Sequence, residues 1–202
     1  MLANYKKFRR LYPRLRFSWS LFYKYLRNDW LGIWQYLTNT EVAPTKAMVK
    51  GKFIHEILEK LPMEKTIQEY LAIEVLDFVK EGKLELDVDH VIPTTLVGIL
   101  DLVVRTKTGD LIVDYKTGKT PLNSYRKQLL FYAIVSERKE YNPKFGMLLK
   151  FNNDFEISDM LFLEFTKKKL VEFEEEVYTA INEIALRITE GELDKFLEMN
   201  NL

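Results

Sequence analysis

The sequence predicts a mixed α/β fold, and three observations support this expectation. Short runs rich in Val, Ile and Leu, separated by turn residues, predict strands at 84–90, 96–105, 110–116, 145–151 and 156–164. Longer stretches with apolar residues three or four positions apart predict helices at 46–60, 63–80, from 121 through Gln128, and at 167–188. The 202 residues suffice for one domain with a substantial core.

The helices before the strands carry one candidate functional residue. On the helix expected at 46–60, His55 follows Phe53 and Ile54, so it fits a core histidine or a metal ligand. The helix expected at 63–80 shows an apolar stripe and closes at Gly82.

The next two runs predict a β-hairpin with its turn at 106–109. Side chains alternate between the faces of a strand, which puts Asp114 and Lys116 on one face and Tyr115 on the other. A turn centred on residues 107–108 pairs Asp101 with Asp114. A turn centred on 108–109 pairs Asp101 with Lys116 instead, and both registers cluster the three groups.

The later elements complete the predicted order. Gln128 and Tyr132 lie four residues apart, on one face of the helix that follows Pro121. Asn142 and Pro143 end that helix, and residues 152–154 form the turn between the last two strands. The long helix at 167–188 follows.

Two carboxylates inside apolar strands need a partner, because burying an unpaired carboxylate costs several kcal/mol. Asp101 and Asp114 therefore predict a shared cation, held by oxygen ligands. The alternative is a cross-strand ion pair with Lys116 on a solvated face.

The first residues are basic and aromatic. Every charge from Lys6 to Arg27 is positive, and aromatic residues are interleaved with those charges. Such a segment fits a surface that tracks phosphates and stacks bases. It fits equally well a basic amphipathic helix whose aromatic side chains pack on the core.

Composition excludes several classes of protein. The formal net charge is +0, so the chain as a whole offers no bulk attraction to nucleic acid. With 0 Cys, it holds neither disulfides nor a Cys-ligated iron–sulfur cluster, and a cytoplasmic location is expected. No run approaches the ~20 apolar residues of a membrane span, so no membrane partner is expected.

Four motifs together resemble the PD-(D/E)XK nuclease superfamily, and within it the RecB-like branch that includes CRISPR-associated exonucleases. They are the 51–59 segment around His55, Asp101 after Gly98, the run Asp114-Tyr115-Lys116-Thr117-Gly118, and Gln128 with Tyr132. The resemblance implies a restriction-endonuclease-like αβββαβ core, with an N-terminal helical segment and a long C-terminal helix. It assigns 1–202 to one nuclease domain, with a helical entry at 1–45, a catalytic core at 46–165 and a helical segment at 166–202.

The resemblance also implies roles for individual residues. His55, Asp101, Asp114 and the backbone carbonyl of Tyr115 would be metal ligands for Mg²⁺ or Mn²⁺. Lys116 would be the catalytic lysine, acting with Asp101 and Asp114. Gln128 and Tyr132 would contact the nucleic-acid strand. Without the iron–sulfur cysteines of many relatives, stabilisation of the entry helices is expected from packing of tryptophans.

The function expected from the resemblance is metal-dependent hydrolysis of DNA phosphodiester bonds, with an exonuclease on single strands as first choice. A structure-specific endonuclease would use the same residues. A non-cleaving nucleic-acid-binding scaffold in a repair, replication or CRISPR-adaptation complex is the alternative from another class. A third alternative is a non-nuclease protein with structural ion pairs at these positions.

Overall fold

The computed structural model describes residues 14–40, 43–58, 60, 63–71, 74–80, 82–89, 92–137 and 140–200. They form two compact units, each built from separate stretches of chain. Among these described residues, one unit contains those between 43 and 84 and between 98 and 171, and the other contains 14–40, those between 85 and 97, and 172–200. Within the described residues, no helix has the length and apolarity needed to cross a membrane.

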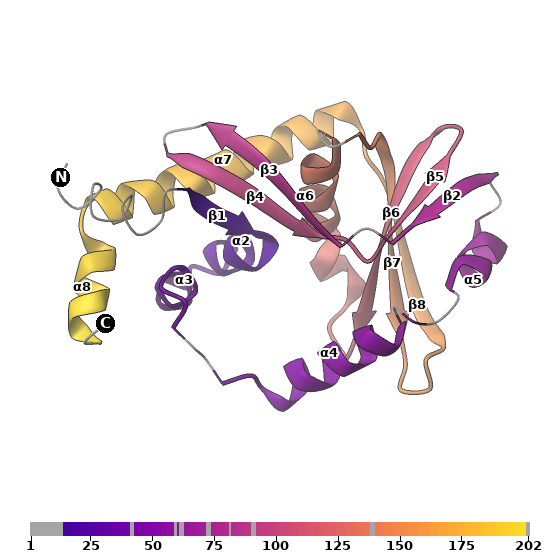
Figure 1. Ribbon diagram of the computed structural model, residues 1–202, viewed down its shortest axis with the longest axis horizontal. Helices are drawn as coiled ribbons and strands as arrows, with labels where there is room; N and C mark the ends of the chain where they lie inside the picture. The colour runs from indigo at the N-terminus through magenta and orange to yellow at the C-terminus, as the bar shows by residue number, and fades with distance from the viewer. Residues whose placement is uncertain are drawn as a thin grey trace. The chain divides into compact units, whose positions relative to one another are not determined.

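The unit of 43–84 and 98–171 is built on a five-stranded sheet with the order β2-β5-β6-β7-β8 (Figure 1). Its strands are β2 (Val75–Val79), β5 (Leu102–Thr106), β6 (Gly109–Thr117), β7 (Pro143–Phe151) and β8 (Ile157–Glu164). Neighbouring strands are antiparallel, except that β6 and β7 run parallel. A parallel pair needs a crossover, and here the 3-10 helix η1 (Leu122–Tyr125) and α6 (Arg126–Glu137) provide it.

Side-chain alternation along β6 assigns the helices of this unit to the two sheet faces. Val113 and Tyr115 point into a core cluster that contains Ile54 and Leu58 of α4 (Lys46–Leu58) and residues of α5 (Met63–Tyr70). Asp114, between them, points to the other face, where Gln128 of α6 contacts it. The parallel pair thus lies between α4 and α6, and the side chains of Asp114 and Lys116 lie on the face covered by α6.

One predicted element in this unit is wrong. Residues 63–80 do not form one helix, because α5 ends at Tyr70 and 75–79 form the edge strand β2. The apolar spacing of Val75, Phe78 and Val79 fits a helix, but β-branched and aromatic residues pair well in a sheet. Phe78 indeed lies opposite Val104 of β5.

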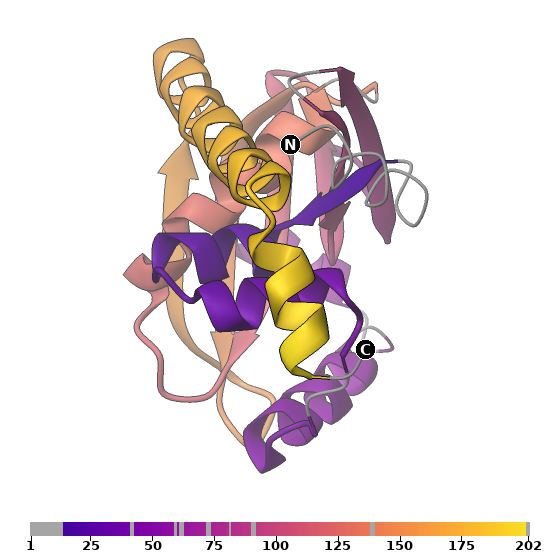
Figure 2. The same ribbon diagram turned by 90° about the vertical axis from the view of Figure 1, so that its left-hand side faces the viewer.

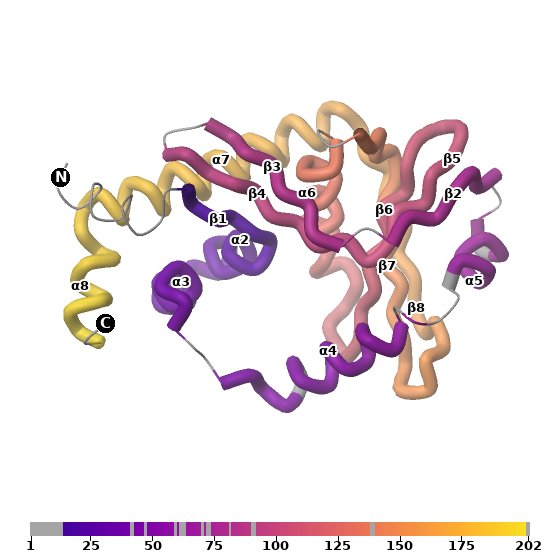
Figure 3. Tube along the Cα trace, viewed as in Figure 1, coloured from indigo at the N-terminus to yellow at the C-terminus, as the bar shows by residue number. Residues whose placement is uncertain are grey.

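A second correction concerns the strand predicted at 96–105. It is two strands, β4 (Pro93–Ile99) and β5, which belong to different sheets. The backbone of Leu100 pairs with that of Gly82 at N···O distances of 2.9 and 3.3 Å, and the chain bends at Asp101. Figure 3 labels β4 and β5 as two separate segments of the Cα trace.

The other unit contains most of a three-stranded sheet, in the order β1-β4-β3, and helices. Its elements are β1 (Leu15–Ser18), α2 (Trp19–Leu26), α3 (Trp30–Leu37), parts of β3 (Lys83–Asp89), β4 and α7 (Lys167–Thr189), and α8 (Glu192–Met199). Figure 2 shows α7 turning into α8, a helix that the sequence prediction missed. Gly191, with φ of 85°, permits that turn.

Aromatic packing stabilises this unit. The rings of Trp30 and Trp34 lie 5.7 Å apart, and the Arg187 guanidinium lies 3.8 Å from the ring centre of Trp30. Phe22 is fully buried and meets Phe173 of α7 edge-on at 5.6 Å. Aromatic contacts thus connect α2 and α3 with α7 within this unit.

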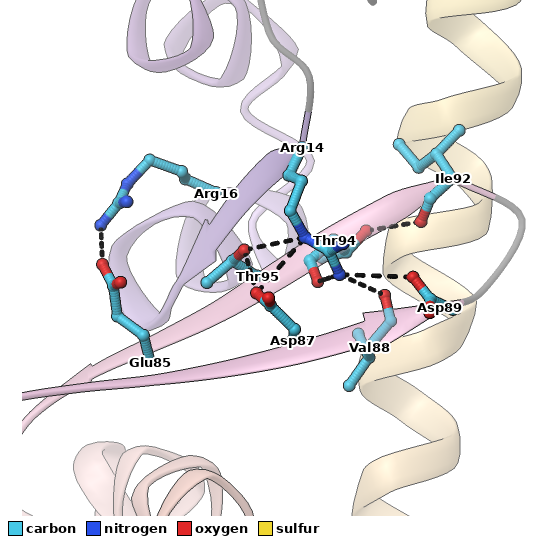
Figure 4. A network of polar contacts seen from close by, with 9 residues as sticks. All are labelled: Arg14, Arg16, Glu85, Asp87, Val88, Asp89, Ile92, Thr94 and Thr95. Atoms are coloured by element: carbon cyan, nitrogen blue, oxygen red, sulfur yellow. Dashed lines mark hydrogen bonds and ion pairs between the residues drawn. The ribbon is translucent and has the colours of Figure 1, made fainter.

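The basic segment predicted at 6–27 is described only from residue 14 onward, and residues 6–13 lie outside the described residues. Arg14 donates to Thr95 Oγ1 at 3.2 Å and pairs with Asp87 and Asp89 (Figure 4). Arg16 pairs with Glu85 at 2.6 Å. These two arginines therefore neutralise acids of β3, which favours the core-packing interpretation for 14–27 over a phosphate-tracking surface.

Candidate active site

The centre of the candidate site is Asp114, on the middle strand of the five-stranded sheet. Its side chain is 4% exposed, and its Oδ2 atom forms an ion pair with Lys116 Nζ. Gln128 Nε2 lies 3.5 Å from the other oxygen, Oδ1. Apart from the ion pair, buried Oδ2 receives no hydrogen bond from the residues described.

Asp101 lies just beyond the end of the β5–β6 ladder. The hairpin turn is at residues 107–108, and its register ends at Leu102 opposite Val113. This is the register that pairs Asp101 with Asp114, but the bend removes Asp101 from the ladder. Its carboxylate accepts the N–H of Tyr115 at 2.7 Å instead. Asp101 thus satisfies a backbone donor where β5 no longer runs beside β6.

His55 of α4 reaches the same carboxylate from another element. Its Nδ1 atom lies 3.6 Å from Asp101 Oδ1, an ion-pair distance that is long for a hydrogen bond. The Asp101 carboxylate raises the pKa of His55 above its ordinary value, against the opposing effect of burial. Asp101 therefore connects the helix of His55 to the backbone of β6.

Burial has the largest effect on the electrostatics of Asp114. It raises the pKa of this carboxyl to about 6, although the ammonium of Lys116 opposes the shift. The charge of Asp101 adds to the increase. A carboxyl whose pKa is raised by burial and by a second acid is typical of a functional site.

Gln128 and Tyr132 line the face of Asp114. Gln128 Nε2 donates to the Tyr132 hydroxyl oxygen at 2.6 Å, and both side chains are buried. Burial also raises the pKa of the Tyr132 hydroxyl well above its usual range. The predicted spacing of four residues does place the two side chains together.

Every predicted site residue therefore lies in one unit, and contacts connect them in two groups. One group joins His55, Asp101 and the backbone of Tyr115, and the other joins Asp114, Lys116, Gln128 and Tyr132. Tyr115 directs its own ring into the core, where it meets Phe151 edge-on at 5.6 Å. Its side chain is thus structural, and only its backbone remains available to the site.

A divalent ion fits part of this donor set. Within the described part of the chain, no group of three or more His, Cys, Asp or Glu side chains could hold a metal ion. Joint ligation by His55, Asp101 and Asp114 therefore stays a prediction. Mg²⁺ is usually bound by one or two carboxylates, with water and phosphate oxygens filling the other positions. Two acids, of which Asp114 is buried with Lys116 as the ion-pair partner of its Oδ2 atom, suit such an ion.

One residue beside Lys116 was missed by sequence reasoning. Lys116 Nζ lies 4.8 Å from the ring centre of Tyr125 in η1, a cation–π contact. The sequence motif places Lys116 on a strand, but apart from Pro121 nothing in the sequence indicates that the segment after this strand folds back onto Lys116. The contact with Tyr125 therefore requires the three-dimensional path of the crossover.

The mixed α/β fold, with its five-stranded sheet and the long helix α7, is the fold class expected of a nuclease with a restriction-endonuclease-like core. Residues 52–195 match the model of the PD-(D/E)XK nuclease superfamily. Since this match spans more than half of the 202 residues, the chain belongs to the PD-(D/E)XK nuclease superfamily. Nucleases of this superfamily use divalent metal ions.

Two solved structures of LHK-Exo are similar to this chain in fold. The one described as an alkaline exonuclease from Laribacter hongkongensis is 14% identical, with a TM-score of 0.56 and 86% of each chain covered. The one in complex with dAMP is also 14% identical, with a TM-score of 0.57, covering 92% of this chain and 93% of that one. Both confirm the mixed α/β nuclease fold. No curated protein matches by sequence.

Proposed function

We propose that this chain is a Mg²⁺- or Mn²⁺-dependent deoxyribonuclease, acting as an exonuclease on single-stranded DNA. The observation that carries the proposal is the Asp114–Lys116 pair, in which a buried carboxylate without a hydrogen bond to Oδ2 lies against an ammonium. Hydrolysis of a phosphodiester needs an activated water and neutralisation of the developing negative charge. The pair offers a group for each task.

The proposed roles follow from the contacts. Asp101 and Asp114 would hold the ion, with His55 and the backbone carbonyl of Tyr115 as further ligands. Asp101 is fixed for this role by the N–H of Tyr115 and by His55. When bound, the ion would supply charge neutralisation and a more acidic water.

Lys116 would orient the attacking water and offset charge on the phosphate. Its side chain is only 13% exposed, and it is held between Asp114 and the Tyr125 ring. Gln128 would fix the orientation of the Asp114 carboxylate and, with Tyr132, contact the substrate strand. An ammonium restrained on two sides is preorganised for this task.

The exonuclease choice is supported by fold, since the alkaline exonuclease LHK-Exo is similar to this chain. The single-strand preference came from the basic aromatic segment, whose Arg14 and Arg16 pair with acids of β3. The basic residues left to support a preference for single strands include those at 6–13, and cleavage of single-stranded and double-stranded DNA has to be compared directly. A role in DNA repair, and assembly with protein partners in a repair, replication or CRISPR-adaptation complex, belong to the same proposal.

The test is incubation of the purified chain with labelled single-stranded, double-stranded and circular DNA, with and without Mg²⁺ or Mn²⁺. The proposal expects cleavage of linear single strands only with the metal, and loss of cleavage in Asp114→Ala and Lys116→Ala. Cutting of circles would favour the endonuclease. Binding without any cleavage would favour the scaffold, and undiminished cutting by either variant would show that the site is assigned wrongly.

A further inference from the structure

A row of charged residues crosses three strands beside the candidate site. The register places Lys116 of β6 next to Lys150 of β7, and Lys150 next to Asp159 of β8. Paired residues on neighbouring strands lie on the same sheet face, with the strands about 4.8 Å apart. The catalytic-lysine candidate therefore has a second lysine as its immediate neighbour.

The ammonium of Lys150 contacts the segment that follows β6. Its Nζ atom donates to the carbonyl oxygen of Thr120 at 3.1 Å, in the segment that connects β6 with η1. The Asp159 carboxylate, on the other side, accepts the N–H of Met160 at 2.9 Å. Lys150 is thus held by the same crossover segment that brings the Tyr125 ring to Lys116.

This arrangement is unfavourable by itself. Two ammonium groups on paired positions repel each other. An ion pair between Lys150 and Asp159 would lower the electrostatic energy of these charged side chains. The negative charge of Asp114 is already matched by Lys116. A second cation on this face is explained by a second negative charge that arrives with the ligand.

We propose that Lys150 is a phosphate-binding residue of the nuclease site and holds the phosphate next to the scissile one. This inference rests on the proposed function. One strand spacing separates Lys150 from Lys116, so the two ammonium groups would bind consecutive phosphates of one nucleic-acid strand. The neighbouring phosphate is an internal phosphodiester or, at a chain end, a terminal phosphate, and both have the anionic oxygens that an ammonium binds.

The test compares Lys150→Gln with Lys150→Arg, and with Lys144→Gln as matched control. Lys144 is an exposed lysine of the same strand, six positions earlier. For Lys150→Gln we expect KM for single-stranded DNA to rise about 5- to 10-fold, with kcat changed less than about 2-fold. The slope of log KM against log salt should fall by about 0.7, the value for one phosphate contact on a single strand.

Lys150→Arg should retain most of the wild-type KM and salt slope, because it keeps the charge, and Lys144→Gln should match the wild type. All variants should melt within a few degrees of one another. A purely structural role for Lys150 would lower the melting temperature and leave the salt slope unchanged, which would overturn the proposal.

Modified substrates identify the phosphate. A methylphosphonate at the linkage next to the cleaved one removes the charge of that linkage. With this substrate, the KM of the wild type should rise by about as much as the Lys150→Gln substitution raises it on unmodified DNA. The KM of Lys150→Gln itself should not rise further. If the ligand is a terminal phosphate, an oligonucleotide with a hydroxyl in place of that phosphate should give the same pattern of KM values. If each modified substrate raises KM equally for wild type and Lys150→Gln, Lys150 binds neither phosphate and the proposal is wrong.

Failure of the proposed function gives a different pattern. If the wild type cleaves nothing with either metal, the nuclease proposal fails, and binding of a fluorescent oligonucleotide replaces KM as the measurement. Equal affinity and equal salt slope for wild type and Lys150→Gln would then overturn the inference about Lys150 separately.

Discussion

The ammonium of Lys116 lies 4.8 Å from the centre of the Tyr125 ring, on a helix turn that starts the crossover between the two parallel strands. A cation over an aromatic face contributes about 0.5–2 kcal/mol, depending on its desolvation. The Tyr125 ring and the Asp114 carboxylate therefore both restrain the lysine.

Replacement of Tyr125 by Leu should lower kcat about 2- to 30-fold, which is the cation–π contribution expressed as a rate. Tyr125→Phe keeps a ring face and should retain most of the activity. Single-turnover cleavage of a labelled oligonucleotide measures both variants. Equal rates for Leu and Phe would show that the ring does not position Lys116.

Loss of Lys116 and loss of Asp114 should separate metal binding from turnover. Lys116→Ala should keep stabilisation by Mn²⁺ while cleavage falls at least 100-fold, the usual lower range for a proton-transfer group. Asp114→Ala should lose both properties, because it removes an oxygen ligand. Thermal melting with and without millimolar Mn²⁺ measures the binding, since a ligand at 100 times its Kd stabilises by about 2.7 kcal/mol. A Mn²⁺ shift that survives in Asp114→Ala would contradict the ligand assignment.

The metal-free protein should lose stability as pH rises from about 4 to 8. The folded pKa of Asp114, about 6, lies above the ordinary value of 3.8, and the pKa of His55 is also raised. A group with a raised folded pKa stabilises below its unfolded pKa, and that contribution disappears as pH passes the folded value. Thermal melting across this range should therefore show a decline, smaller in Asp114→Asn, which stays neutral.

The metal should reverse this trend. Ionised carboxylates bind divalent ions, so the rise in melting temperature caused by Mn²⁺ should grow as pH increases through about 6. A Mn²⁺ effect independent of pH between 5 and 8 would mean that Asp114 does not take part in binding.

Replacement of Gln128 by Leu should destabilise the fold by about 1–3 kcal/mol, because it leaves buried polar groups without a partner. The groups affected are the Tyr132 hydroxyl, bonded at 2.6 Å, and Asp114 Oδ1 at 3.5 Å. The double variant Gln128→Leu with Tyr132→Phe should recover part of the loss. Urea denaturation measures both, and strictly additive losses would argue against the contact.

The local geometry of the candidate site was predictable from the sequence, because strand alternation and helix spacing are periodic. They correctly place Asp114 beside Lys116 and Gln128 beside Tyr132. The turn at 107–108 is one of the two registers that the hairpin motif allows.

The errors arise where long-range pairing decides the structure. The stripe from Val75 to Val79 fits a helix as well as a strand, and the ladder with β5 selects the strand. The bend at Asp101 depends on Gly82, which is distant in sequence. Lys150 was missed for the same reason, because only the parallel register brings it next to Lys116.

The division of the chain into interleaved stretches has a practical consequence for fragments. Shortening the chain from the front or from the back removes parts of the same body, such as Phe22 or its packing partner Phe173. The acids and the lysine would remain in such truncations. An inactive deletion would therefore report loss of packing in that unit rather than loss of the reacting groups. Point substitutions, rather than deletions, are the means to locate the chemistry.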